Sequence, residues 1–154
     1  MTLRLLHTLA LCWMMVGIGA VVVPIWRAWA SSDLDTRVLL LSEAQRNEAQ
    51  WLLPGILATG VSGFAWAAGA NWNLVRTGWL AAKELVFALD VFIFLPLMGV
   101  GLRRVRLLAL QAQKRGEMTA ELRDALADNV PLVFGTVLAL TMPAMVALAV
   151  FRPF

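Results

Sequence analysis

The sequence predicts an all-α protein: a bundle of four transmembrane helices with short interfacial or cytoplasmic helices in its loops. Three observations support this. Hydrophobic residues make up 60% of the 154-residue chain, against about 45–50% in soluble domains. Charged residues make up only 15%, whereas soluble domains carry about 25%. The few charges also mark the edges of four long apolar segments. This pattern excludes a disordered chain and a water-soluble enzyme.

Each of the four apolar segments is long enough to cross the ~30 Å hydrocarbon core of a bilayer as a helix. Helices are the expected form because lipid does not tolerate unpaired backbone groups. The third segment differs from the others because it carries Lys83, Glu84 and Asp90. We expect one integral membrane domain over residues 1–154, with spans at approximately 5–26, 51–70, 78–102 and 130–151.

The basic residues are divided unequally between the two ends of this bundle. Four spans place both termini and the 71–77 loop at one end, which carries Arg4, Arg76 and Arg152. The other end carries nine basic residues: Arg27, Arg37, Arg46, Arg103, Arg104, Arg106, Lys114, Arg115 and Arg123. The positive-inside rule therefore predicts a multi-pass protein of the bacterial inner (cytoplasmic) membrane, with both termini on the periplasmic, outer side. It also explains the net charge of +3 better than a nucleic-acid partner, and we expect none.

The two long loops are expected to contain helices. Residues 34–46 place four apolar side chains on one helical face: Leu34, Val38, Leu41 and Ala44. This spacing predicts a short amphipathic helix lying on the membrane surface. Residues 102–115 are expected to continue the third span as far as Gly116. Thr119 is expected to cap another short helix before Pro131.

A stripe of small residues runs along the second span, at intervals of four: Gly55, Thr59, Gly63 and Ala67. Small residues let another helix approach closely, and close packing drives helix association in lipid. The stripe therefore predicts a closely packed neighbour. One hypothesis is that this neighbour belongs to a homo-oligomer or to a larger membrane complex, in which the chain is a non-catalytic accessory subunit.

The ionisable residues of the third span are the first candidates for chemistry. Lys83, Phe87 and Asp90 follow the i, i+4, i+7 spacing of one helical face, and Glu84 stands beside it. Charged groups inside a membrane are costly and usually face the bundle interior or a water-filled cavity. We take Lys83 and Asp90 as candidate catalytic residues. The alternative is structural: Lys83 and Glu84 extend to the interface, and Asp90 is neutral or paired.

His7 is the second candidate, because the topology places it in the same leaflet as Lys83. The two side chains can therefore line one pocket. Imidazole is a common axial ligand of haem iron, and helical bundles hold cofactors between facing helices. His7 is the candidate metal ligand, and Met145, or Met142 beside it, the candidate second ligand. The alternative is that the histidine and the methionines only pack. With one histidine and one cysteine, the chain has no multi-histidine metal cage and no intramolecular disulfide.

Several short motifs resemble the HemJ-type and CopD-like superfamily of small bacterial four-helix membrane proteins, including its uncharacterised predicted integral membrane relatives. Leu6-His7 followed by Trp13 is similar to the first-span histidine motif of the family. Gly78-Trp79-Leu80 with Lys83 is similar to its Gly-Trp-Leu-x-x-Lys motif. Further similarities are Pro24 with Arg27, Asn129 with Pro131, and the ending Arg152-Pro153-Phe154.

The resemblance implies a four-helix fold and, for HemJ-type proteins, binding of haem b and oxidation of protoporphyrinogen IX. On this basis His7 would be the haem ligand and Lys83 a cation of the porphyrin site. The chain departs from the family because it has no tyrosine and no second histidine. The sequence thus leaves two main hypotheses: a haem- or porphyrin-binding redox protein, or a non-catalytic accessory subunit. A third, transport of an ion or proton through Asp90, is weaker because four spans are few for a carrier.

Overall fold

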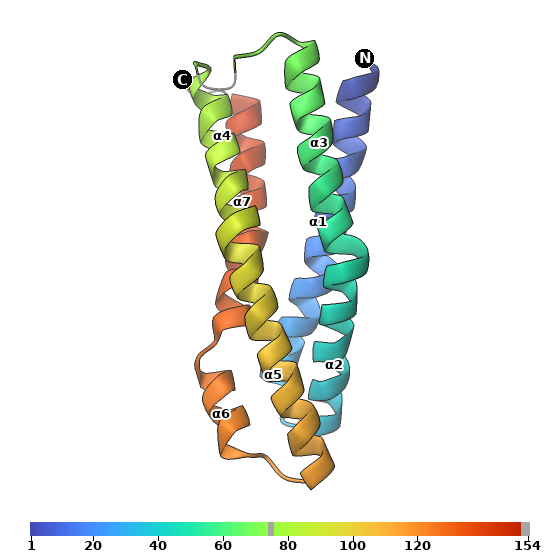
Figure 1. Cartoon of the computed structure of the whole chain (residues 1–154), viewed down its shortest axis with the longest axis vertical. Coiled ribbons are helices and arrows are strands. Elements are labelled where there is room, and N and C mark those ends of the chain that lie inside the picture. The colour runs from blue at the N-terminus through green and yellow to red at the C-terminus, as the bar shows by residue number, and fades with distance from the viewer. Residues whose placement is uncertain (74–75, 152–154) are drawn as a thin grey trace.

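The computed structural model describes residues 1–73 and 76–151, which form an elongated bundle of helices (Figure 1). The first rod is α1 (Thr2–Ala30). The second joins α2 (Leu34–Asn47), η1 (Glu48–Leu52) and α3 (Leu53–Gly69). The third joins α4 (Gly78–Leu89), η2 (Asp90–Phe94) and α5 (Leu95–Arg115), and α6 (Ala120–Ala127) leads to α7 (Val130–Phe151). The N-terminus, the end of α3, the start of α4 and the end of α7 lie at the same end of the bundle, which we call the terminal end (Figure 1). The α1–α2 turn and α6 lie at the loop end.

The predicted fold class is confirmed, because four helices are long and apolar enough to cross a membrane. Each predicted span lies in a different one of them. The third rod runs on to Arg115 and ends at Gly116, which adopts the left-handed conformation (φ 72°). The Thr119 side chain accepts a hydrogen bond from the backbone N–H of Leu122 and caps α6, as expected. The family-like ending Arg152-Pro153-Phe154 lies outside the described residues.

The helix predicted over 34–46 forms as α2, but the prediction that it lies on the membrane surface is wrong. α2 continues through η1 into α3 as part of one 36-residue helix. Its apolar face packs against α1 and α5 rather than lipid. Arg37 secures the turn that precedes α2, because its buried guanidinium donates hydrogen bonds to the carbonyls of Ala28 and Ser31 at the end of α1.

A π-helical turn, η1, joins α2 to α3. The backbone N–H of Leu53 donates to the carbonyl of Glu48, five residues back instead of the usual four. Pro54 follows at once. A proline ring inside an α-helix clashes with the carbonyl four residues earlier, and the wider turn relieves this clash. The π-turn therefore lets one straight helix contain a proline.

The same arrangement recurs in the third rod, where the N–H of Leu95 donates to the carbonyl of Asp90 and Pro96 follows. Glu48 and Asp90 thus each begin a π-turn, and both are buried, with 5% of their surface exposed. π-turns are rare in proteins overall, but those that occur often lie at functional sites.

α1 and α3 pack so closely that glycine is required at their crossing. A Cβ on Gly17 would lie 2.8 Å from Cα of Leu52, and a Cβ on Gly55 would lie 2.9 Å from Cα of Met14. The small-residue stripe therefore has its close neighbour inside the chain. α1 thus occupies the part of the stripe at Gly55 and Gly63 that the accessory-subunit hypothesis assigns to a partner.

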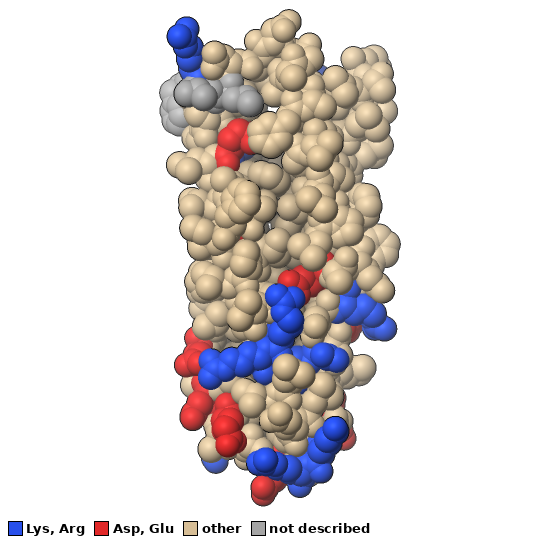
Figure 2. Space-filling view, viewed as in Figure 1, with Lys and Arg blue, Asp and Glu red and all other residues tan. Residues whose placement is uncertain are grey.

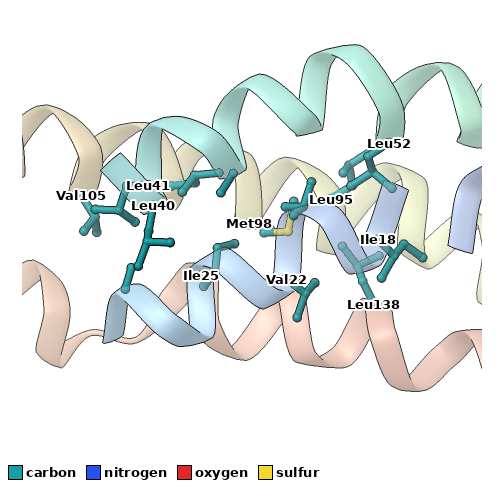
Figure 3. Close-up of a cluster of buried hydrophobic side chains, with 14 of the residues drawn as sticks. Ile18, Val22, Ile25, Leu40, Leu41, Leu52, Leu95, Met98, Val105 and Leu138 are labelled. Atoms are coloured by element: carbon teal, nitrogen blue, oxygen red, sulfur yellow. The ribbon is translucent and has the colours of Figure 1, made fainter. Parts of the chain in front are cut away.

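The core below the middle of the bundle is apolar, and every rod contributes to it (Figure 3). Its largest fully buried side chains include Ile25, Leu41, Leu52, Met98, Leu102 and Val105. Charged side chains gather around the loop end, whereas a broad middle band of the face seen in Figure 2 is largely uncharged. This division is the one expected of a bundle whose middle lies in hydrocarbon.

Candidate functional site

A cavity of about 210 Å³ lies in the terminal half of the bundle, between the α1–α3 pair and the α4–α7 pair. α1 packs against α3 and α4 against α7, whereas α3 and α4 share no extensive packing along their described residues. The Phe87 ring of α4 nevertheless reaches Gly60 of α3, where it lies 3.3 Å from an ideal Cβ position. The cavity therefore sits where the two helix pairs separate.

His7 reaches this cavity from α1 and is itself buried, with 6% of its surface exposed. Its Nδ1 lies 3.1 Å from the Ser62 hydroxyl oxygen. The Ser62 hydroxyl also lies 2.6 Å from the carbonyl oxygen of Ala58 and 3.2 Å from that of Thr59, and it can donate to either. In the tautomer in which this hydroxyl accepts from His7, Nδ1 carries the imidazole proton and Nε2 has the free lone pair.

The space that the imidazole occupies depends on Gly63. A Cβ at this position would lie 3.0 Å from Cε1 of His7, closer than two carbon atoms pack at their optimal separation of about 3.5–4.0 Å. Trp66 flanks the other side of the ring, with a centroid separation of 5.6 Å. The small-residue stripe thus serves the site as well as the helix crossing.

Aromatic rings continue from Trp66 across the terminal end of the cavity. Trp66 and Trp72 have centroids 5.2 Å apart, and Trp72 and Trp79 have centroids 5.7 Å apart. All three indoles line the cavity together with Phe87. Their flat apolar surfaces suit a flat, unsaturated ligand, since aromatic rings prefer offset or edge-to-face contacts with one another.

Lys83 lines the same cavity from α4, as the sequence predicts for a residue in the leaflet of His7. Its Nζ lies 3.9 Å from Oε1 of Glu84, which also lines the cavity. The cavity thus combines one imidazole and one ion pair with walls that are otherwise largely apolar.

Met142 and Met145 line the cavity from α7, and both are buried. The structure therefore brings the predicted second ligand, Met145, to the cavity of His7. Thr59 of α3 lines it too, and its buried hydroxyl makes no hydrogen bond to any described residue. A buried hydroxyl is normally satisfied, so Thr59 is a polar group available to a bound molecule.

Asp90 does not line the cavity, which separates it from Lys83 and His7. It follows Phe87 by three residues, or about 4.5 Å along the helix axis, and so lies just beneath the cavity floor. Thr141 of α7 lies near the carboxyl, and Oδ1 of Asp90 makes no hydrogen bond to the described residues. The structure therefore gathers His7 and Lys83 in one cavity and places the buried carboxyl of Asp90 outside its lining.

Glu48, which the sequence presents as the flank of a span, is also buried inside the bundle. Its Oε2 lies 3.7 Å from Nη1 of Arg103, and Gly99 leaves room for its other oxygen. This pair lies toward the loop end, among the charges of that end. Glu48 and Asp90 share a sequence pattern: each is an acidic residue followed, after four intervening residues, by Leu-Pro.

Sequence reasoning did not identify Ser62, Thr59 and Trp66 as site residues. Thr59 belongs to the stripe, which indicates packing, and Trp66 lies near the end of a span, where tryptophan is common. Ser62 carries a recognisable signal, because it is a hydroxyl-bearing residue directly before Gly63 of the stripe. In the described residues, no three His, Cys, Asp or Glu side chains gather as a metal site.

Comparison with known proteins gives one match, and it covers nearly the whole chain. A family model described as "Predicted integral membrane protein (DUF2269)" matches residues 1–153. The chain belongs to this family. No curated protein and no solved structure matches the chain. As a DUF2269 membrane protein with four candidate spans, it contacts the lipid bilayer.

Proposed function

We propose that this DUF2269 protein binds haem b, or a closely related porphyrin, in the cavity between its helix pairs, with Nε2 of His7 as the iron ligand. The observation that carries the proposal is the hydrogen bond between Nδ1 of His7 and the Ser62 hydroxyl. A hydrogen bond at one imidazole nitrogen fixes the tautomer and orients the ring, which leaves the other nitrogen for a metal.

The other residues of the cavity suit the same ligand. Trp66, Trp79 and Phe87 supply flat apolar walls, and Met145 supplies a thioether of the kind that pairs with histidine at haem iron. Lys83 is a cation for a propionate group. The cavity volume of about 210 Å³ is below the ~300–1,000 Å³ of typical ligand pockets. A macrocycle would therefore also occupy the space between α3 and α4.

We further propose that the protein is an oxidoreductase of the protoporphyrinogen oxidase type. Support comes from the resemblance to HemJ-type proteins at His7, Trp79 and Lys83, which now prove to line one cavity. Bound haem would supply one-electron chemistry. Lys83 would hold an anionic group of the substrate, and Asp90, the other candidate catalytic residue, would take up a proton beneath it.

The division of charge supports a location in the bacterial inner membrane with both termini outside. Lys and Arg concentrate around the loop end (Figure 2), which the positive-inside rule assigns to the cytoplasm. The cavity would then lie in the outer leaflet. Fusion of a reporter that is active only in the periplasm tests this topology: a C-terminal fusion should be active, and a fusion at Gly116 should be inactive.

The absorption spectrum of protein purified from membranes in a mild detergent tests the haem proposal. We expect a Soret band that is lost in His7→Ala. Leu6→Ala is the matched control, because Leu6 is adjacent in sequence but 51% exposed on the outside of the bundle, and it should keep the band. A colourless protein, or an unchanged spectrum in His7→Ala, would refute His7 ligation and favour a non-catalytic role.

A further inference from the structure

We propose that Asp90 is a proton-exchange site inside the membrane that communicates with the terminal end of the bundle through the cavity, and that the apolar core closes it off from the loop end. The inference holds whether or not the cavity binds a porphyrin.

The position of Asp90 supports the first half of this proposal. Its carboxyl shares one helical face with Lys83 and Phe87, both of which line the cavity, and it is the next residue on that face toward the loop end. Thr141, which lies near it on α7, directly precedes Met142, which also lines the cavity. The carboxyl thus lies one helical step beyond the residues that line the cavity in the terminal half of the bundle.

The hydrogen bonds around Asp90 fit both of its protonation states. The Thr141 hydroxyl lies 3.0 Å from the carbonyl of Leu138, to which it can donate. With its hydrogen directed there, the hydroxyl can accept a hydrogen bond from a protonated Asp90. When Asp90 is ionised, the same hydroxyl can turn and donate to the carboxylate. Thr141 thus provides a partner for either state with a rotation of one hydroxyl.

Among the described residues, no cation forms an ion pair with Asp90. α7 has no charged residue from Val130 to Phe151, and α5 has none before Arg103. The ionisable groups that line the neighbouring cavity are Lys83 and Glu84, which pair with each other on α4, and His7 on α1. Glu48 provides the contrast, because it begins the other π-turn with equal burial but is paired with Arg103. A buried carboxyl without a cation is free to change its protonation.

The apolar core supports the second half of the proposal. Below Asp90, four helical rods contribute side chains that meet in one layer: Ile18, Leu52, Leu95, Met98 and Leu138 (Figure 3). Each is buried, with at most 7% of its surface exposed. Such a layer offers no hydrogen-bonding group to carry a proton. A proton therefore joins and leaves the carboxyl on the cavity side, through water in the cavity, and does not cross the bundle.

Infrared difference spectroscopy after a pH jump tests the proposal on detergent-solubilised protein. We expect a carboxylic acid band that appears at low pH, is absent in Asp90→Asn and persists in Glu48→Gln. If Asp90→Asn does not fold, Thr141→Val provides a second assignment, because loss of the hydroxyl should shift the frequency of the band. A carboxyl at residue 90 that does not respond to pH would overturn the proposal.

The route is tested by blocking the cavity. In a Cys12→Ser background, Thr8→Cys places a thiol in the cavity lining, and a bulky thiol reagent then fills the space. We expect the Asp90 band to respond to the pH jump at least ten-fold more slowly after labelling. Glu117→Cys, labelled at the exposed loop end, should leave the rate unchanged. An unchanged rate after labelling at residue 8, or slowing by the label at residue 117, would show that the proton takes another route.

Discussion

The crossing of α1 and α3 makes a quantitative prediction, because two glycines of α1 differ in what surrounds them. A Cβ on Gly17 would lie 2.8 Å from Cα and 3.0 Å from N of Leu52, whereas a Cβ on Gly19 would have no atom within 4 Å. The atoms facing Gly17 are backbone, so no side chain can turn away. In Gly17→Ala the two helices must separate locally.

The magnitude follows from comparing the two substitutions. Both alanines gain the same helix propensity, about 1 kcal/mol relative to glycine, so the difference between the variants isolates the steric cost. Overpacking of a well-packed interior costs about 1–3 kcal/mol. We therefore expect Gly17→Ala to be less stable than Gly19→Ala by that amount.

Unfolding of the purified protein in mixed micelles, with increasing sodium dodecyl sulfate, measures this difference by far-ultraviolet circular dichroism. Gly55→Ala should behave like Gly17→Ala, because its Cβ would lie 2.9 Å from Cα of Met14. The double variant should lose less than the sum of the two, since helices separated by the first methyl group accommodate the second. Equal stability of Gly17→Ala and Gly19→Ala would refute the close crossing of α1 and α3.

Three further substitutions test other contacts. Ser62→Ala removes the hydrogen bond that orients His7 and should weaken haem affinity about 10–100-fold, measured by haem titration; unchanged affinity would contradict the assigned tautomer. Gly99→Ala places a methyl group against the Glu48 carboxylate and should cost about 1–3 kcal/mol of unfolding free energy by leaving a buried charge poorly paired; wild-type stability would show that the carboxylate can move freely. Thr119→Ala removes the cap of α6 and should cost about 1 kcal/mol, whereas Thr119→Ser should cost little in the same unfolding assay.

The four spans and the helix ends at Gly116 and Thr119 could be predicted because their signals are local. Apolar length, flanking charge, a left-handed glycine and a capping hydroxyl act within one element. The orientation of α2 could not be predicted in this way. Its apolar face shows that the helix is buried on one side, but the pattern does not say whether that side meets lipid or, as here, α1 and α5.

The sequence predicts how deep the site residues lie in the membrane, but not which side chains contact one another. Counting residues from the span ends places His7 and Lys83 in one leaflet, and both line the cavity. The same count places Asp90 deeper, yet it cannot show that the cavity floor lies between Asp90 and Lys83. The hydrogen bond between His7 and Ser62 depends on how α1 is rotated about its axis against α3. This rotation is determined by the close packing at Gly17 and at Gly55 of α3.

Titration of the purified protein with haem b in lipid nanodiscs tests the central claim most directly. The structure predicts a Soret shift that saturates at one haem per chain in the wild-type protein and in Leu6→Ala, with binding strongly weakened in His7→Ala. Non-saturating uptake that is equal in all three proteins would be simple partitioning into lipid, and it would contradict a haem site built around His7.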